Sequence, residues 1–219
     1  MGEDKAHLRL GGRTLVEIAA GKLRPCCDEV VVVSGERDLD PVGDRAIRDL
    51  HPGCGPIGGM EAALRDVCER GPSEWAMFVP VDMPLVPAGL LGWLLDRWIE
   101  DTETSRVCLA KADGRVQPLL SLLHAEIEPY LGRAILAGNY KVTPVLFEAA
   151  DDLARARGLA GEAVLRIEPI ETMTAADAGS DWTPTAEEQR LWFQNVNTPA
   201  EFQDIKQMLR ERGAPDGSL

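Results

Sequence analysis

Hydrophobic and polar positions follow two different periods along this chain. Apolar residues between Leu15 and Leu23 recur at helical spacing, and the strand-like run at 29–34, with four consecutive valines, is typical of a buried strand. The turn residues Asp113 and Gly114 separate two later strands. The same patterns predict further helices at 60–68, 90–99, 127–136, 142–150 and about 199–212, and further strands at 75–81, 107–110 and 118–123.

Apolar runs without alternation indicate strands that are covered on both faces. Such strands, separated by amphipathic helices, are typical of the doubly wound α/β class with a mostly parallel sheet. We therefore expect the strands at 30–33 and 77–81 to share one parallel sheet within a single domain of residues 1–212. Residues 168–190, rich in Glu, Asp, Thr and Pro, are expected to form a surface excursion, and 213–219 a flexible tail.

Composition and charge narrow the function classes. The chain has 219 residues, of which 45% are hydrophobic and 27% charged, as in a globular domain and unlike a disordered chain. Its 36 acidic and 23 basic residues give a net charge of −13, which disfavours nucleic acid and anionic membranes as partners. No apolar run approaches the roughly 20 residues that span a bilayer. The N-terminus lacks the apolar stretch of a signal peptide, so the cytoplasm is the expected compartment.

Cysteines and histidines offer no site for a soft metal. The five cysteines include no CxxC pair, and His7, His51 and His124 are widely spaced. We expect reduced thiols, and we expect any bound metal to be a hard ion held by oxygen ligands.

One carboxylate stands at the end of a predicted strand. In the segment 78–84 an apolar run ends at Asp82, and Pro84 stops the strand. Because ligands of doubly wound folds bind at the carboxyl ends of strands, Asp82 is a candidate Mg²⁺ ligand that would work together with phosphate oxygens. The alternative is that Asp82 only caps the helix that begins near Pro87.

A glycine-rich loop at 53–59 precedes the predicted helix at 60–68. Its glycines let a ligand approach the backbone, and the free N–H groups at the start of the helix favour an anionic or polar ligand. A tight turn with positive φ explains these glycines equally well. The loop matches neither a Walker A loop nor GxGxxG.

Polar residues near the two ends of the chain also have ordinary explanations. Lys5 and its neighbour Asp4 fit a solvated terminus. Asn197 or Thr198 fits the cap of the last helix, with Pro199 at the first helical position. Neither segment indicates a function by itself.

Six motifs, taken in their order along the chain, carry a family resemblance. They are Met1–Lys5, Gly11–Leu15, Gly55–Gly59, Val81–Pro84, Gln117–Leu119 and Asn195–Pro199. Over about residues 1–212 the chain resembles the molybdenum cofactor guanylyltransferase family. The resemblance implies a Rossmann-like nucleotidyltransferase with a sheet of the nucleotide-diphospho-sugar transferase type. Such an enzyme joins the GMP part of GTP to the phosphate of molybdopterin and releases pyrophosphate with Mg²⁺.

The resemblance implies roles in nucleotide binding for four residues. Lys5 corresponds to the lysine that binds the triphosphate, and Asp82 to the aspartate that binds the metal. Asp49 corresponds to an aspartate near the guanine, where a carboxylate can accept from the ring N–H and the amino group. Ser34 stands where relatives often have an asparagine for the base, which weakens the inference that the base is guanine.

Two further segments are assigned to the second substrate by the same resemblance. Gly55, Pro56 and Gly59 belong to the loop expected against the substrate. Asn195 and Asn197 are expected near the metal and the pterin side. The implied partners are GTP and molybdopterin, with molybdoenzymes or cofactor-handling proteins as candidate protein partners.

The chain departs from the family at its first residue. Relatives begin with a strand and a loop of the type Leu-Ala-Gly-Gly-x-Ser-x-Arg directly before the segment that matches Met1–Lys5, and the printed sequence starts inside this signature. We therefore expect the first strand, which would lie between the strands at 30–33 and 77–81, to be missing, and transfer by this chain to be slight. A start codon assigned too far downstream, or a shortened form of the protein, explains the absent signature better than loss of catalysis does. The reason is that the remaining site residues are present.

Two kinds of alternative function remain. A cytidylyltransferase acting on molybdopterin or a sugar-phosphate nucleotidyltransferase would use the same fold, and turnover of CTP, ATP and GTP separates these activities. A nucleotidyltransferase-like binding protein without catalysis is the alternative from another class.

Overall fold

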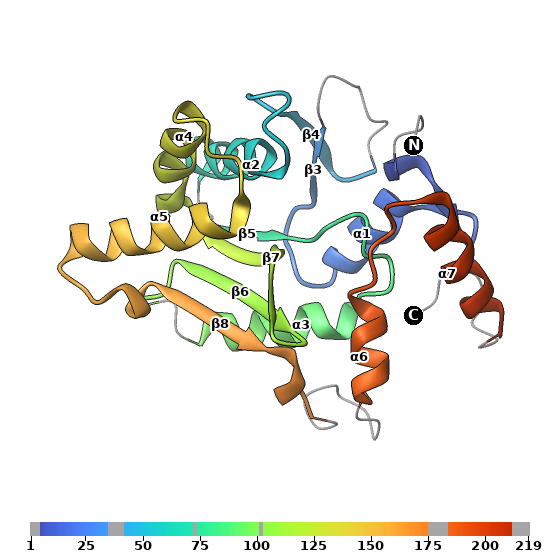
Figure 1. The fold of residues 1–219 in the computed structure, drawn as a ribbon. Coiled ribbons are helices and arrows are strands. Elements are labelled where there is room, and N and C mark those ends of the chain that lie inside the picture. Colours follow the sequence, from blue (N-terminus) through green and yellow to red (C-terminus); the bar gives the residue numbers. More distant parts are fainter. Residues whose placement is uncertain (1–4, 35–41, 72–73, 101–102, 175–183, 212–219) are drawn as a thin grey trace.

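The computed structural model describes residues 5–34, 42–71, 74–100, 103–174 and 184–211 (Figure 1). Its strands are β1 Arg9–Leu10, β2 Arg13–Thr14, β3 Val31–Ser34, β4 Arg45–Arg48, β5 Trp75–Phe78, β6 Val107–Ala112, β7 Arg115–His124 and β8 Leu165–Pro169. Its α-helices are α1 Leu15–Leu23, α2 Pro56–Arg70, α3 Ala88–Ile99, α4 Glu128–Leu136, α5 Val142–Arg157, α6 Ala186–Trp192 and α7 Pro199–Glu211. Four short 3-10 helices complete the described structure: η1 Lys5–His7, η2 Ala125–Ile127, η3 Gly161–Ala163 and η4 Ile170–Thr172. Every predicted helix and strand is present, but the strand predicted at 75–81 ends at Phe78, so Asp82 follows it in a turn. β1, β2, β4, β8 and α6 were not predicted.

The main sheet is mixed, with strand order β5-β7-β6-β8. Strand β7 is antiparallel to both β5 and β6, and β8 is parallel to β6. The turn between β6 and β7 is Asp113 and Gly114, both with positive φ (48° and 72°), and a two-residue turn can join only antiparallel neighbours. The expected α/β class is therefore confirmed, but the strand pairing of this sheet is not mostly parallel.

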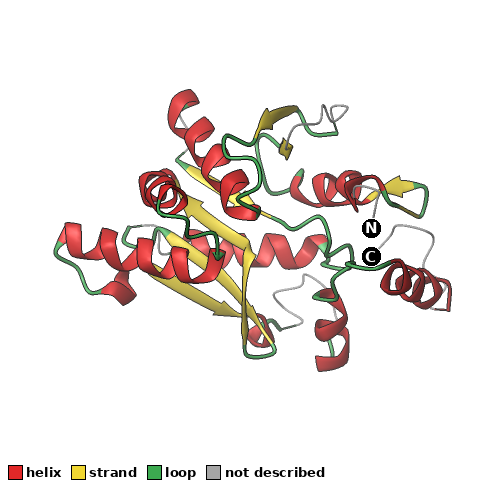
Figure 2. Cartoon of the chain, turned by 45° about the horizontal axis from the view of Figure 1, so that its top comes forward, coloured by secondary structure: helices red, strands yellow, loops and turns green. Residues whose placement is uncertain are grey.

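Helices cover both faces of this sheet (Figure 2). Along β6, Val107 and Leu109 pack into the core under α2, α4 and α5, while Cys108 and Ala110 pack into a second core against α3. All four side chains are fully buried. Because successive residues of a strand point to opposite faces, the continuous apolar run is what a strand with two covered faces requires.

Strands β3 and β4 form a separate parallel pair, and α2 runs antiparallel to them. Near the start of α2, a Cβ on Gly59 would lie 3.4 Å from Val33 Cγ1 toward the end of β3. Toward the end of α2, Asp66 Oδ1 accepts a hydrogen bond from Arg45 Nη1 at the start of β4 (2.8 Å). The carboxyl ends of β3 and β4 therefore lie beside the start of α2.

Strand β5 begins at the same end of α2 as β3 and β4. Cys68 Sγ, near the end of α2, lies 3.8 Å from the carbonyl oxygen of Ala125. The backbone N–H of Ala125 donates to the carbonyl of Glu74, directly before β5 (2.7 Å). Strands β3 and β5 therefore run in the same direction.

A cavity of about 540 Å³ lies between β3 and β5. Its walls are the two strands, one side of α1 and one side of α2. The prediction that 30–33 and 77–81 share one parallel sheet is therefore wrong for the described residues: the strands are parallel, but each pairs only on its other side.

The expected surface excursion at 168–190 is wrong where residues are described. Glu168 lies in β8, and it is buried together with Ile170 and Met173. The content of Glu, Asp, Thr and Pro did not reveal this burial: Glu168 pairs with Arg166 (Oε2 to Nη2, 3.2 Å), and Ile170 and Met173 pack into the core against α3. Residues 175–183 and the expected tail at 213–219 lie outside the described residues.

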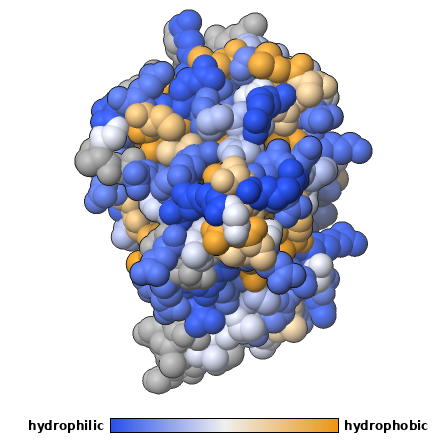
Figure 3. All heavy atoms as spheres, turned by 90° about the vertical axis from the view of Figure 1, so that its left-hand side faces the viewer, coloured by the Kyte–Doolittle hydropathy of each residue, from blue (hydrophilic) through white to orange (hydrophobic). Residues whose placement is uncertain are grey.

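The surface is predominantly hydrophilic where Figure 3 shows it, with hydrophobic residues scattered between polar ones. This agrees with the charged composition of the chain. Among the described helices, none is long and apolar enough to cross a membrane.

Candidate active site

Three segments that are distant in the sequence meet beyond the carboxyl end of β5. Lys5 in η1 donates a hydrogen bond from Nζ to Asn197 Oδ1, which precedes α7 (2.5 Å). The backbone N–H of Val196 donates to the carbonyl of Asp82, which lies in the turn after β5 (2.8 Å). The structure therefore brings together Lys5, Asp82 and the segment 195–197.

The segment 195–197 is fixed by its middle residue. Val196 is fully buried and packs in a small core with Leu10, Leu15 and Leu85. Its two neighbours, the asparagines at 195 and 197, are exposed. Packing of one apolar side chain thus holds two amide side chains at the surface next to Asp82.

Helix α7 is capped by Thr198 and not by Asn197. The Thr198 hydroxyl accepts from the backbone N–H of Glu201 (3.2 Å), and Glu201 Oε2 accepts from the backbone N–H groups of Asn197 (2.7 Å) and Thr198 (2.8 Å). These hydrogen bonds, together with the charge of Lys5, hold the pKa of Glu201 below its usual value. The side chain of Asn197 is therefore left for Lys5.

Asp82 is half-buried, and among the described residues its carboxylate has no hydrogen-bond or ion-pair partner. The alternative that it caps the next helix is wrong, because the N-cap of α3 is Pro87 and no side chain caps it. In the described part of the chain, no group of three or more His, Cys, Asp or Glu residues is placed to hold a metal ion. A lone carboxylate in the turn that follows a strand suits Mg²⁺, which takes its other ligands from water and substrate phosphates.

Lys22 was missed by the sequence analysis. It lies on the buried side of α1, and its Nζ donates to the carbonyl of Pro84, two residues after Asp82. Burial, aided by the nearby charge of Arg13, lowers the pKa of Lys22 to about 8. The available signal was a lysine at an apolar helical position, four residues after Ile18.

A second cluster lies at the carboxyl ends of β3 and β4. Ser34, the buried last residue of β3, accepts a hydrogen bond at its carbonyl from the backbone N–H of Asp49 (2.9 Å). The parallel register of β3 and β4 places Ser34 opposite Arg48, the residue before Asp49. This register brings Ser34 and Asp49 together. Ser34 and Asp49, the two residues assigned to the base, are thus adjacent.

The Asp49 carboxylate lies against the first turn of α2. Its Oδ1 accepts from the backbone N–H of His51 (2.8 Å), and a Cβ on Gly58 would lie only 2.7 Å from that oxygen. Only glycine fits there without displacing the carboxylate. One oxygen of Asp49 therefore stabilises the loop, which leaves Oδ2 for a ligand.

The glycine-rich loop combines the two explanations considered for it. Gly53 and Gly55 have positive φ (89° and 71°), as a tight turn requires. Gly55 is also the N-cap of α2, with Pro56 at the first helical position and no side chain on the free N–H groups. Gly59 packs against Val33, which assigns it a packing role between α2 and β3.

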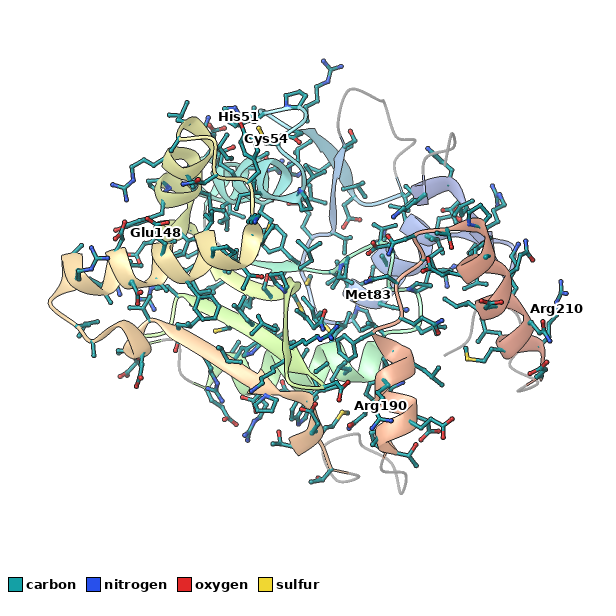
Figure 4. All side chains as sticks on the ribbon, viewed as in Figure 1. His51, Cys54, Met83, Glu148, Arg190 and Arg210 are labelled. Atoms are coloured by element: carbon teal, nitrogen blue, oxygen red, sulfur yellow. The ribbon has the colours of Figure 1, made fainter. Side chains whose placement is uncertain are left out.

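The two clusters are separated in the structure. Figure 4 shows Met83, next to Asp82, well away from His51 and Cys54, which flank the loop after Asp49. The cavity between β3 and β5 extends to both clusters, because Val33 and Val81 both line it. The described chain therefore places the two clusters of predicted site residues on either side of one cavity.

Comparisons with known proteins show the family to which the chain belongs. The MobA-like NTP transferase domain matches residues 1–153. The molybdenum cofactor guanylyltransferase of Cereibacter sphaeroides is 33% identical over 182 residues, covering 81% of this chain and 88% of that protein. That of Serratia proteamaculans is 31% identical over 163 residues, covering 73% and 76%. The crystal structure of molybdopterin-guanine dinucleotide biosynthesis protein A from Archaeoglobus fulgidus shares the fold, with a TM-score of 0.67 at 23% identity over 96% of this chain and 92% of that one. The chain belongs to the MobA-like molybdenum cofactor guanylyltransferase family of nucleotidyltransferases.

Proposed function

We propose that this protein transfers the GMP part of GTP to the phosphate of molybdopterin and releases pyrophosphate. The observation that carries the proposal is the meeting of Lys5, Asp82 and Asn197 beyond the carboxyl end of β5. In doubly wound folds this edge is where ligands bind. The family relationship supports the choice of substrates.

The phosphate of molybdopterin would attack the α-phosphorus of GTP, and pyrophosphate would leave. Such a transfer needs positioning and charge neutralisation more than covalent help from the protein. Lys5 supplies a positive charge that Asn197 Oδ1 holds in place. Its role is to bind the triphosphate and to offset the charge that develops on the leaving pyrophosphate.

Mg²⁺ fits the donor set, since Asp82 offers an unpartnered carboxylate beside the exposed amide side chains of Asn195 and Asn197. Bound there, the ion would neutralise phosphate charge during transfer. Asp82 itself would hold the ion, and Lys22 would hold the Asp82 turn through the carbonyl of Pro84.

Substitution of Asp82 tests the proposal. Asp82→Asn keeps the shape and removes the charge, so we expect Mg²⁺-dependent GTP binding and transfer to molybdopterin to fall by roughly 100-fold, or about 3 kcal/mol. The matched control is Asp204→Asn, an exposed carboxylate on α7. Unchanged GTP binding and transfer in Asp82→Asn would contradict the assignment.

Asp49 is proposed to select guanine through Oδ2. Asp49→Ala should weaken GTP relative to CTP by about 1–3 kcal/mol, the value of a charge-assisted hydrogen bond. Titration of GTP and of CTP into the unsubstituted protein and into Asp49→Ala measures the ratio of the two affinities. Comparing this ratio between the proteins also corrects for any loss of loop structure. A ratio that does not change would favour the cytidylyltransferase alternative, for which Ser34 in the asparagine position is the motivating observation.

A further inference from the structure

Helices α1, α6 and α7 each begin after a threonine that is followed three residues later by a glutamate. In α1 and α6 the glutamate side chain accepts from the backbone N–H and from the hydroxyl of its own threonine, as in an ordinary capping box. In α7, Glu201 Oε2 accepts from the backbone N–H groups of Thr198 (2.8 Å) and of Asn197 (2.7 Å). Glu201 therefore reaches one residue beyond the cap, to the residue whose side chain binds Lys5.

The segment before α7 is held at two successive residues. Val196 is fixed by the burial of its side chain and by the hydrogen bond from its N–H to the carbonyl of Asp82. The backbone of Asn197 is fixed by Glu201. Without Glu201, rotation about the backbone bonds between Val196 and Asn197 would carry Asn197 Oδ1 away from the Nζ of Lys5, to which it is hydrogen-bonded.

Helix α7 gives the Glu201 carboxylate a rigid support. The residues that dock this helix are buried on one face of it: Phe202, Ile205 and Leu209. They pack in the small core that also contains Leu10, which lies shortly after Lys5 in the sequence. Figure 1 shows α7 beside this N-terminal part of the chain. The half-buried Glu201, directly before Phe202, is therefore held in place relative to the segment that carries Lys5.

We propose that Glu201 is a positioning residue of the transfer site, which fixes Asn197 and, through Asn197, holds Lys5 where the triphosphate binds. This role rests on the proposed function, because it deepens the part given there to Lys5. Lysine has a long, flexible side chain, and ordering it before the ligand arrives lowers the entropy cost of binding. Glu201 acts through its hydrogen bonds to the backbone and does not touch the substrate.

The experiment measures binding of inorganic triphosphate, with Mg²⁺, to the 219-residue chain and its variants by titration calorimetry. Glu201→Ala removes both hydrogen bonds, and we expect it to weaken binding by about tenfold because Lys5 is no longer ordered. Glu201→Gln keeps an oxygen that can accept from the same two N–H groups, so it should bind as the unsubstituted protein does. Equal losses in Glu201→Ala and Glu201→Gln, or no loss in Glu201→Ala, would overturn the proposal.

Thr198→Ala is the matched control at the same helix end. It removes the hydroxyl that accepts from the N–H of Glu201 (3.2 Å) and leaves the two N–H groups that donate to Glu201. Thermal unfolding should show a similar loss of stability in Thr198→Ala and Glu201→Ala, since both weaken the cap of α7. Only Glu201→Ala should bind triphosphate more weakly. Equal losses of binding would overturn the proposal, because a weakened helix end would explain them.

Lys5→Met separates this role from the proposed function. Lys5→Met should bind triphosphate at least as weakly as Glu201→Ala, and the double variant should bind little worse than Lys5→Met alone, because Glu201 acts through Lys5. Additive losses would overturn the role of Glu201 and leave that of Lys5 intact. Tight binding by Lys5→Met, or no binding by the unsubstituted protein, would contradict the role proposed for Lys5 and that of Glu201 with it. The probe contains neither guanine nor molybdopterin, so these outcomes do not depend on the substrates assigned to the transfer.

Discussion

Strands β6 and β3 carry similar apolar runs but lie in different surroundings. β6 has β7 and β8 as neighbours and helices on both faces, and four of its residues are fully buried. β3 pairs only with β4 and borders the cavity, so three of its four residues are half-buried. The comparison teaches that an apolar strand needs neighbouring strands and helices to bury its side chains. Only the tertiary structure shows whether those neighbours are present.

The largest expected difference is between the losses of unfolding free energy caused by core truncations in the two strands. Leu109→Ala in β6 is expected to lower the free energy of unfolding by about 2–5 kcal/mol, because the fully buried site leaves a cavity. Val32→Ala in β3 should lower it by less than about 1 kcal/mol. Denaturant unfolding of both variants measures the contrast. Equal costs for Val32→Ala and Leu109→Ala in the 219-residue chain would refute the contrast between the two strands.

Lys22 provides a pH test of the N-terminal region. Its folded pKa of about 8 lies below its ordinary value of 10.5, so the folded protein binds the proton less well than the unfolded chain. The resulting cost, about 3 kcal/mol, is fully present below pH 8 and is relieved as the pH rises toward 10.5. Stability of the unsubstituted protein relative to Lys22→Met should therefore rise across this window.

Unfolding free energies of the two proteins at several pH values check this prediction. Lys141→Met, which removes an exposed lysine ahead of α5, is the control and should show no such rise. A flat difference between the unsubstituted protein and Lys22→Met from pH 7 to 10 would show that Lys22 is not buried as the structure places it.

The smallest expected effect concerns two helix caps of the same type. Thr14 caps α1 and Thr185 caps α6, each in a capping box with the glutamate three residues later. Replacement of either threonine by alanine should cost about 1 kcal/mol. Thermal unfolding compares them, and a clearly smaller loss for Thr14→Ala would show that α1, beside the cavity, opens before the main sheet unfolds.

The candidate site was predictable where it depends on local sequence. An apolar run that ends at Asp82 before Pro84 placed this carboxylate near the end of a strand, although β5 itself ends at Phe78. The Thr198-Pro199 pair located the start of α7. Lys22 could not be assigned in this way, since its partner is the carbonyl of Pro84, 62 residues away. Long-range pairing of this kind leaves no periodic signal in the sequence.

The sequence by itself determined the positions of the main helices and strands, because local periodicity and turn residues act over a few positions. It also determined that strands such as β3 and β6 need cover on both faces. Only the tertiary structure decided that Lys5 contacts Asn197 across 192 residues. It alone also decided that β7 lies between β5 and β6, and that a cavity separates β3 from β5, because strand order is set by packing between distant segments.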